Sequence, residues 1–354
     1  MESLIGTDPK IVFAFWLGVV ITVMTVVMLT VILIMRQLVL RRERNHARGV
    51  ASWRRVLMAG PNEATAQVPT LRLRDLSGFL EAWNEAHEPL HGGTTPYLSR
   101  IAGEVGLEKQ LYRILDQRGF HKHLVAIIAL GHVKNSGNFH RIEAFIDDKS
   151  PIVSLCAARA LMQIDPGRAA SMVVPQIVRR HDWSQGSIAT ILQEAGGDHV
   201  LSQELSEATL QAHAEIAPRL VRLLASVSPE AAAPIIRKSL ASSTDERLIS
   251  TCLQVMSNPA ALDLVRPLLT HSRWHVRMLA AVTLGRLGVA GDEQRLIAML
   301  ADEQWWVRYR AAQALMKLPF VDAGQMRQIQ QAQTDKYARD VIDHVLAEHH
   351  KEAA

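Results

Sequence analysis

Residues 302–318 read DEQWWVRYRAAQALMKL, and versions of this stretch recur along most of the chain. The apolar and small residues of the stretch fall on one face of a helix. They are Val307, Ala311, Ala312, Leu315 and Leu318. Asp302 stands where an N-cap or turn residue belongs. The stretch therefore predicts an amphipathic helix that starts shortly after Asp302.

The same pattern, an apolar residue with small or apolar residues three and four positions before it, occurs six more times upstream of Leu315. These apolar residues are Leu130, Leu161, Leu192, Leu224, Val255 and Leu284, and the successive spacings up to Leu315 are 31, 31, 32, 31, 29 and 31 residues. Each interval has room for one further helix, such as 292–300. A period of about 30 residues made of two helices is typical of an α-solenoid.

The two most regular copies are HSRWHVRMLAAVTLGRLG, from His271, and the stretch 302–318. They resemble HEAT and HEAT-like repeats, whose second helix carries an Asp, then Val-Arg, then paired alanines and a leucine. The tetratricopeptide and ankyrin patterns fit less well, because their sequence motifs are missing. The resemblance implies an all-α fold, an α-solenoid of about seven HEAT-like helix pairs. In that register Ala281 and Ala312 occupy the small position where paired helices approach.

Val-Arg occurs at Val276-Arg277 and at Val307-Arg308. The equivalent positions upstream hold Val153-Ser154, Ser184-Gln185 and Ile216-Ala217. We therefore do not expect a regular Arg–Asp ladder along all the repeats.

Composition agrees with a helical chain, since 48% of the 354 residues are hydrophobic and only 5% are aromatic. Alternating apolar and polar runs of the kind that form strands are missing outside the N-terminus. The two cysteines, Cys156 and Cys252, fall on the core faces of repeat helices. They are interpreted as small buried residues in a reducing compartment, which disfavours a disulfide, a metal site or a catalytic thiol.

Residues 11–36 are predicted to form a transmembrane helix after a short extracytoplasmic tail, 1–10. Ile11 to Met35 contains no charged residue, and 25 helical residues extend roughly 37 Å, enough to cross a hydrocarbon core of about 30 Å. A cleaved signal peptide needs a basic start, a shorter apolar region and a small-x-small site. None of these features is present.

Arginines flank only the C-terminal end of this span. They are Arg36, Arg41, Arg42, Arg44, Arg48, Arg54 and Arg55, against one acid, Glu43. The positive-inside rule then predicts an N-out, C-in single-pass protein of the bacterial inner membrane, with the repeats in the cytoplasm. The same arginines are candidates for contact with anionic lipid headgroups.

The whole chain has a net charge of +4, to which the arginine-rich stretch contributes +6 and the first 35 residues −1. Residues 56–354 therefore carry about −1. A nucleic-acid-binding solenoid needs a cationic concave face, so nucleic acid is not expected as a partner.

The rest of the chain divides into three predicted parts: a basic juxtamembrane segment and linker (37–70), an N-terminal capping helix (71–95), and a HEAT-like solenoid with its own C-terminal cap (96–354). Within the first part, Val50–Met58 has two interpretations. It either lies in the membrane interface with Trp53 as an anchor or continues the transmembrane helix. The stretch from Gly78 is similar to the entry region of membrane-anchored bacterial HEAT-repeat proteins.

Side chains suited to catalysis are scattered. HEAT-like iron enzymes of the deoxyhypusine hydroxylase type use repeated His-Glu pairs, whereas this chain has one such pair, His87-Glu88. We therefore expect no metal and no cofactor. The alternative is a membrane-tethered HEAT-like enzyme, a lyase or a DNA-repair glycosylase, which a cationic groove with an acid such as Asp182 would support.

Tryptophans occupy equivalent repeat positions at the predicted starts of helices. They are Trp183, Trp274, Trp305 and Trp306, with Arg277 and Arg308 close by in the sequence. One interpretation is that they staple successive turns; another is a strip for a protein partner, and a sugar-binding strip is a third. Because Trp305 repeats the position of Trp274, Trp305 is predicted to pack against the neighbouring repeat and Trp306 to contact the partner.

These patterns together predict a non-catalytic, membrane-anchored scaffold that binds a protein at or near the membrane. We expect the partner to belong to a membrane-bound machine such as a polysaccharide synthase or a secretion complex.

Overall fold

The computed structural model describes residues 9–58, 68–72, 75–87, 95–117, 119–196 and 198–352. Over these ranges the chain forms helices, turns and loops and contains no strand, which confirms the all-α prediction. The chain divides into two compact units, residues 1–133 and 134–354.

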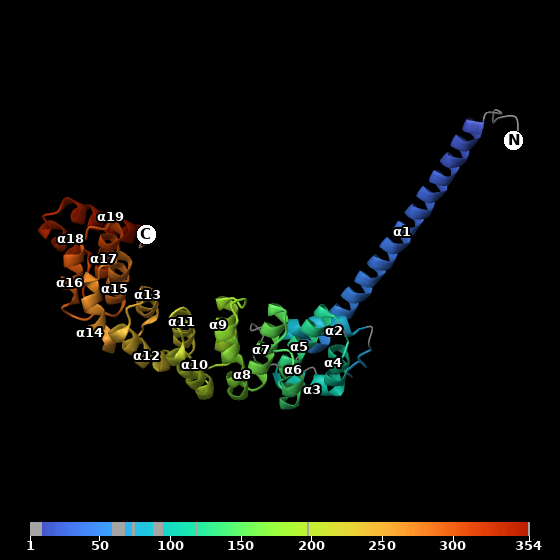
Figure 1. Cartoon of the computed structure of the whole chain (residues 1–354), viewed down its shortest axis with the longest axis horizontal. Helices are drawn as coiled ribbons and strands as arrows, with labels where there is room; N and C mark the ends of the chain where they lie inside the picture. The colour runs from blue at the N-terminus through green and yellow to red at the C-terminus, as the bar shows by residue number, and fades with distance from the viewer. Residues whose placement is uncertain are drawn as a thin grey trace. The chain divides into compact units, whose positions relative to one another are not determined.

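Unit 1 is organised around one very long helix, α1 (Pro9–Met58), drawn in blue in Figure 1. The shorter helices of the unit are α2 (Leu76–Ala86), α3 (Thr95–Glu104), α4 (Leu107–Leu115) and α5 (Phe120–Val133). Helix α2 packs against both α1 and α5, and α4 packs against α3 and α5. Within the stretch predicted as an N-terminal capping helix, 71–95, the structure has the shorter helix α2, which packs on the helix that carries the first repeat leucine, Leu130, itself fully buried.

Helix α1 continues without a break past the predicted end of the transmembrane span. Nearly all its large apolar side chains between Phe13 and Leu40 are exposed, whereas Val50, Trp53 and Leu57 are buried. The edge of the Trp53 ring meets Phe79 of α2 at a centroid distance of 4.9 Å. Continuation of the helix is therefore the correct interpretation of Val50–Met58. Trp53 is not an interfacial anchor, because unit 1 encloses it. The centre of the predicted linker, 59–67, lies outside the described residues.

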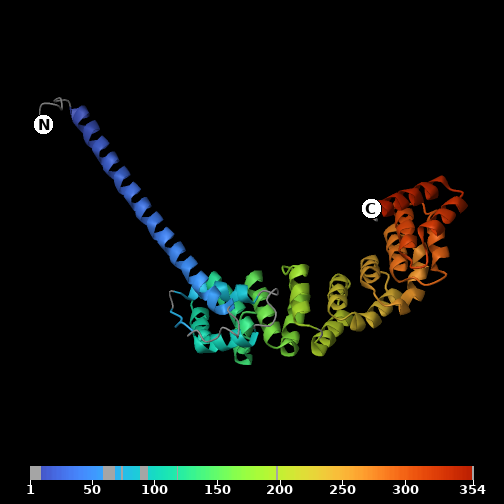
Figure 2. The same cartoon turned by 180° about the vertical axis from the view of Figure 1, so that it is seen from behind.

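Unit 2 stacks its helices in two layers, visible from both sides in Figures 1 and 2. The first layer consists of α7 (Pro151–Ile164), α9 (Gln185–Glu194), α11 (Ala217–Val227), α13 (Glu246–Val255), α15 (Trp274–Leu287), α17 (Trp305–Lys317) and α19 (Lys336–Glu352). Each of these helices packs on the next one in the list.

The second layer contains the helices between them. It comprises η3 (Ser136–Asn138), α6 (Phe139–Glu143), α8 (Pro166–Arg179), α10 (His199–Gln211), α12 (Pro229–Ser242), η4 (Pro259–Ala261), α14 (Leu262–Val265), η5 (Arg266–Thr270), α16 (Asp292–Met299) and α18 (Ala323–Ala332). Contacts join α8 to α10, α10 to α12 and α12 to α14. This two-layer stacking is the helix arrangement of an α-solenoid.

Neighbouring helices of the first layer run parallel. Near their starts, Arg277 of α15 bonds to Asp302, just before α17. Near their ends, Gly285 of α15 lies against the backbone of Ala314 in α17. Equivalent repeat positions therefore lie side by side along one edge of unit 2.

The repeat leucines lie in the core as predicted, with one exception. Leu161, Leu192, Leu224, Leu284 and Leu315 are fully buried, and so are the small residues Ala281 and Ala312. Val255 is only half-buried, whereas Leu253 is buried. Val255 is the last residue of α13, and the residues four and three positions before it, Thr251 and Cys252, are buried like their equivalents in the other repeats.

Proline and short polar residues fix where several of these helices begin. Pro166 and Pro229 occupy the first turn of α8 and α12, where the missing N–H costs nothing. Asp165 and Ser228 cap the same two helices by accepting from backbone N–H groups. The turns between layers are thus specified locally.

Arg–Asp pairs join neighbouring helices of the second layer near the C-terminal repeats, and Arg179 of α8 also pairs with Asp147 earlier in unit 2. Arg237 pairs with Asp263 through two bonds of 2.8 and 2.9 Å. Arg266 pairs with the buried carboxylate of Asp292 at 2.8 and 3.1 Å. Burial alone would raise the pKa of Asp292, but the bonds from Arg266 and from the Val289 N–H outweigh it and hold that pKa below its ordinary value.

Candidate partner-binding surface

The exposed tryptophans of unit 2 lie together at the starts of α15 and α17. Trp274, Trp305 and Trp306 are 40%, 44% and 51% exposed. By contrast Trp53, Trp83 and Trp183 are buried. Large aromatic side chains are usually covered in a folded domain, so their exposure at one edge marks a candidate contact surface. We call Trp274, Trp305, Trp306 and Tyr309 the aromatic rim.

The rings at the start of α17 hold one another in place. Trp305 stacks on Tyr309, with centroids 5.0 Å apart and planes inclined by 8°. Trp306 stands edge-on to Trp305 at 4.7 Å. The Tyr309 hydroxyl donates to the Glu348 carboxylate of α19 at 2.9 Å. These contacts order the three rings of α17 before any partner arrives, which lowers the entropic cost of binding.

Trp305 does not pack into the neighbouring repeat, so that prediction was wrong. Successive residues of a helix point about 100° apart. Trp305 precedes the fully buried Val307 by two positions and therefore points about 200° away from the core. Trp274 stands in the same relation to Val276, which is also fully buried. The repeated position is a solvent-facing one.

Trp183 is not part of the rim. It precedes α9, is almost fully buried, and its indole Nε1–H donates to Ser154 Oγ at 3.1 Å. Ser154 occupies the place that Arg277 and Arg308 have in the later repeats, and its small side chain leaves room for the indole. For Trp183 the stapling interpretation is correct, and a contact with a partner is excluded by its burial.

The two arginines predicted beside the tryptophans, Arg277 and Arg308, both bind the turn at Asp302 that precedes α17. Arg277 binds the Asp302 carboxylate with two bonds of 2.7 and 2.8 Å, and this pairing raises the pKa of Arg277. Arg308 donates to the backbone carbonyls of Asp302 and Glu303 and lies over the Tyr337 ring. Its buried Nε has no hydrogen-bond partner among the described residues. Both guanidinium groups are therefore engaged by the fold.

The juxtamembrane arginines differ in environment. Arg54 forms a bidentate ion pair with Glu85 of α2, with N–O distances between 2.6 and 2.9 Å. The other arginines with a described side chain are exposed on α1; they are Arg36, Arg41, Arg44, Arg48 and Arg55. The side chain of Arg42 lies outside the described residues. Arg54 is thus a docking residue, and the others are available to lipid or to a partner.

The acid and the two thiols that could serve an enzyme are either paired or buried. Asp182 accepts two bonds of 3.0 Å from Arg180, and this pairing lowers the pKa of Asp182. Burial raises the pKa of Cys156, and it raises that of Cys252 to about 12, so neither thiol is poised as a nucleophile. Where the structure describes the chain, no three His, Cys, Asp or Glu residues are grouped to hold a metal ion.

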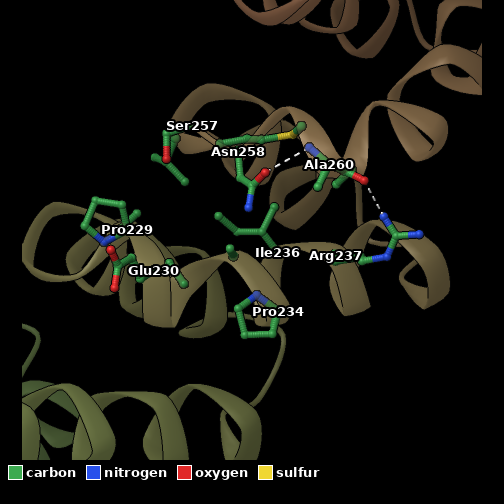
Figure 3. A pocket seen from close by; sticks show the side chains of 14 residues that line it. Pro229, Glu230, Pro234, Ile236, Arg237, Ser257, Asn258 and Ala260 are labelled. Carbon is green, nitrogen blue, oxygen red and sulfur yellow. Dashed lines mark hydrogen bonds between the residues drawn. The ribbon is translucent and has the colours of Figure 1, made fainter.

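A hollow of about 330 Å³ lies between α12 and the turn that follows α13, as Figure 3 shows. Its polar side chains are already used by the fold. Arg237 donates to the Ala260 carbonyl, and Asn258 accepts from the Ala260 N–H. Glu230, at the opposite end of the hollow from Arg237 in Figure 3, is the one acid among its described lining residues. One isolated carboxylate does not make a catalytic set.

Comparison with known proteins adds one family. A family model described as HEAT repeats matches residues 246–316, the segment from α13 to near the end of α17. A comparison with curated proteins finds no match.

A comparison with solved structures finds similarity to several chains, including a human enzyme and an engineered protein. Human deoxyhypusine hydroxylase in complex with glycerol is 17% identical, with 70% of this chain and 99% of that chain covered and a TM-score of 0.29. The crystal structure of an engineered protein is 14% identical, with coverages of 84% and 98% and a TM-score of 0.34. Scores this low support no functional argument.

Proposed function

The chain is a HEAT-like repeat protein, and from this premise we propose that it is a membrane-anchored, non-catalytic scaffold. We propose that it binds a protein partner through the aromatic rim. The observation that carries the proposal is the gathering of Trp274, Trp305 and Trp306, all exposed, at the starts of two parallel helices. Tryptophan is enriched among the residues that dominate binding energy at interfaces. Solenoids offer the long surfaces on which such contacts are arranged.

Helix α1 supports the anchoring part of the proposal. It is long and apolar enough to cross a bilayer, and its apolar window is not buried by the rest of the protein. A signal sequence near the N-terminus passes the same test. We favour a retained anchor, because the same helix continues unbroken to Val50, Trp53 and Leu57 in the core of unit 1. A segment built into the fold in this way serves as a permanent attachment.

The arginines after the span set the proposed orientation, N-out and C-in, at a bacterial inner membrane. Arg36 and Arg41, nearest the apolar segment, are the residues placed to bind anionic headgroups. The solenoid would then lie in the cytoplasm, where its partner is restricted to the membrane or its vicinity. A polysaccharide synthase or a secretion complex would suit this position.

Trp306→Ala is expected to leave the fold close to wild-type stability and to weaken capture of the partner roughly 30-fold, since losing a hot-spot aromatic costs about 2 kcal/mol of binding. Trp305→Ala is expected to weaken capture too and to cost about 1 kcal/mol of stability through its lost stack on Tyr309. The measurements are thermal melts and affinity capture from solubilised membranes.

Trp183→Ala serves as the matched control, because it removes the same side chain from a buried site. It should lower the free energy of unfolding by roughly 3 kcal/mol. If both rim variants captured the partner as well as the wild-type protein does, the aromatic rim would not be the binding surface.

A further inference from the structure

The part of α1 beyond the apolar segment has two opposite faces. At about 100° per residue, His46, Val50, Trp53 and Leu57 fall within an arc of about 60°. This is the face that docks on α2: Val50, Trp53 and Leu57 are buried, and His46 Nε2 lies 3.5 Å from the Glu81 carboxylate.

The docking is close and fixes the rotation of α1 about its own axis. A Cβ atom added at Gly78 of α2 would lie 3.0 Å from the Val50 backbone nitrogen, so the two helices approach at backbone distance. Tyr97 Oη donates to the Val56 carbonyl at 2.7 Å, and Arg54 is held by Glu85. With these contacts on one side of α1, its other side has a defined direction.

That other side is a stripe of arginines. Arg41, Arg44, Arg48 and Arg55 also fall within an arc of about 60°, and the centre of this arc is about 180° from the centre of the docked face. All four side chains are exposed, and none forms an ion pair with an acid among the residues that the structure describes. Glu43 points about 200° away from Arg41 and does not interrupt the stripe.

Repulsion between the arginines of the stripe lowers the stability of helix α1. Arg41 and Arg44 are three residues apart, and Arg44 and Arg48 are four apart. Like charges at these spacings repel each other by a few tenths of a kcal/mol per pair. None of these positions holds an acid that would offset the repulsion. Negative charges supplied by a partner would offset it, so the stripe is complementary to an acidic surface.

Lipid headgroups reach only the first part of the stripe. Counted from Met35, the last residue of the apolar segment, Arg48 is thirteen residues and Arg55 twenty residues further along α1. At 1.5 Å per residue these positions are about 20 Å and 30 Å beyond the hydrocarbon edge. The headgroup layer is only about 5 to 8 Å thick. Arg48 and Arg55 therefore lie in water when α1 spans the bilayer.

We propose that Arg44, Arg48 and Arg55 form a docking stripe for an acidic segment of a partner protein, directly below the membrane and separate from the aromatic rim. The proposal rests on the transmembrane role of α1 proposed above. The partner segment would present carboxylates at helical spacing along the outer face of α1, and each carboxylate would accept charge-assisted hydrogen bonds from a guanidinium group.

The test uses the full chain in nanodiscs of phosphatidylcholine and a fluorescein-labelled helical peptide with glutamates at every third or fourth position. Fluorescence anisotropy at low salt should show binding that Arg48→Gln/Arg55→Gln weakens about tenfold. The matched pair Arg36→Gln/Arg41→Gln, on the lipid side, should change the affinity by less than about twofold. When phosphatidylglycerol is added to the discs, Arg48→Gln/Arg55→Gln should still weaken peptide binding about tenfold; this loss is called the distal effect.

Equal losses in the two double variants, no binding by the wild-type chain, or disappearance of the distal effect in anionic discs would each overturn the docking stripe. The substituted side chains are exposed, and thermal melts of both variants confirm that the fold is kept. Every variant retains the aromatic rim, so failure here leaves the scaffold proposal standing. A wrong membrane assignment would be detected separately, by reporter fusions that measure on which side of the membrane the C-terminal end lies.

Discussion

Trp53→Ala is expected to destabilise unit 1 by about 3 to 5 kcal/mol, the usual cost of removing a buried Trp side chain. The ring of Trp53 is almost fully enclosed and meets Phe79 edge-on, and Phe79 in turn stacks on Trp83 at 5.8 Å. Removing the indole leaves a cavity between α1 and α2. Hydrogen exchange in α2, followed together with thermal melts of the full chain, measures the loss.

Trp16→Ala is the matched control, because Trp16 is 60% exposed in the apolar segment of the same helix. This variant should leave hydrogen exchange in α2 unchanged. If Trp53→Ala behaved in the same way, the C-terminal end of α1 would not be part of the unit 1 core. The fixed direction of the arginine stripe would then be lost as well.

Gly285→Ala is expected to destabilise unit 2 by about 2 to 3 kcal/mol through overpacking, less up to about 1 kcal/mol gained in helix propensity. The added Cβ would lie 2.5 Å from Ala314 Cα and 2.6 Å from Ala314 Cβ. Both atoms are close to the backbone of α17, so no side-chain rotation relieves the clash. Helices α15 and α17 must separate, and the thermal midpoint should fall.

Gly186→Ala makes the same chemical change in the first turn of α9, where an added Cβ meets nothing within 4 Å. It should be neutral or slightly stabilising. Equal midpoints for the two variants would show that α15 and α17 do not pack as closely as described.

The sequence was sufficient to predict the repeat architecture, because the period of the apolar residues is a direct result of stacking helices. Leu284 and Leu315 are buried one repeat apart for the same geometric reason. Val255 is less buried than the other repeat residues because it is the last residue of α13. The spacing between Val255 and Leu284 is 29 residues, and choosing Leu253 instead would move the 29-residue spacing to the interval after Leu224, so this repeat is two residues shorter in either register.

The candidate surface was only partly predictable. The exposure of Trp305 follows from its position two residues before Val307, so the helical angle was available in the sequence. The burial of Trp183 was not, because it depends on the small Ser154 of the preceding repeat. Docking of α1 likewise depends on Gly78 and Phe79, more than twenty residues further along the chain.

The central claim, a scaffold held by one span with its repeats in the cytoplasm, is tested most directly by reporter fusions after Ala354. With arginines flanking only the C-terminal end of the apolar segment, the account predicts an inactive alkaline phosphatase fusion and a fluorescent protein fusion that fluoresces. An active phosphatase with a dark fluorescent fusion would place the repeats outside the cytoplasm and contradict the account.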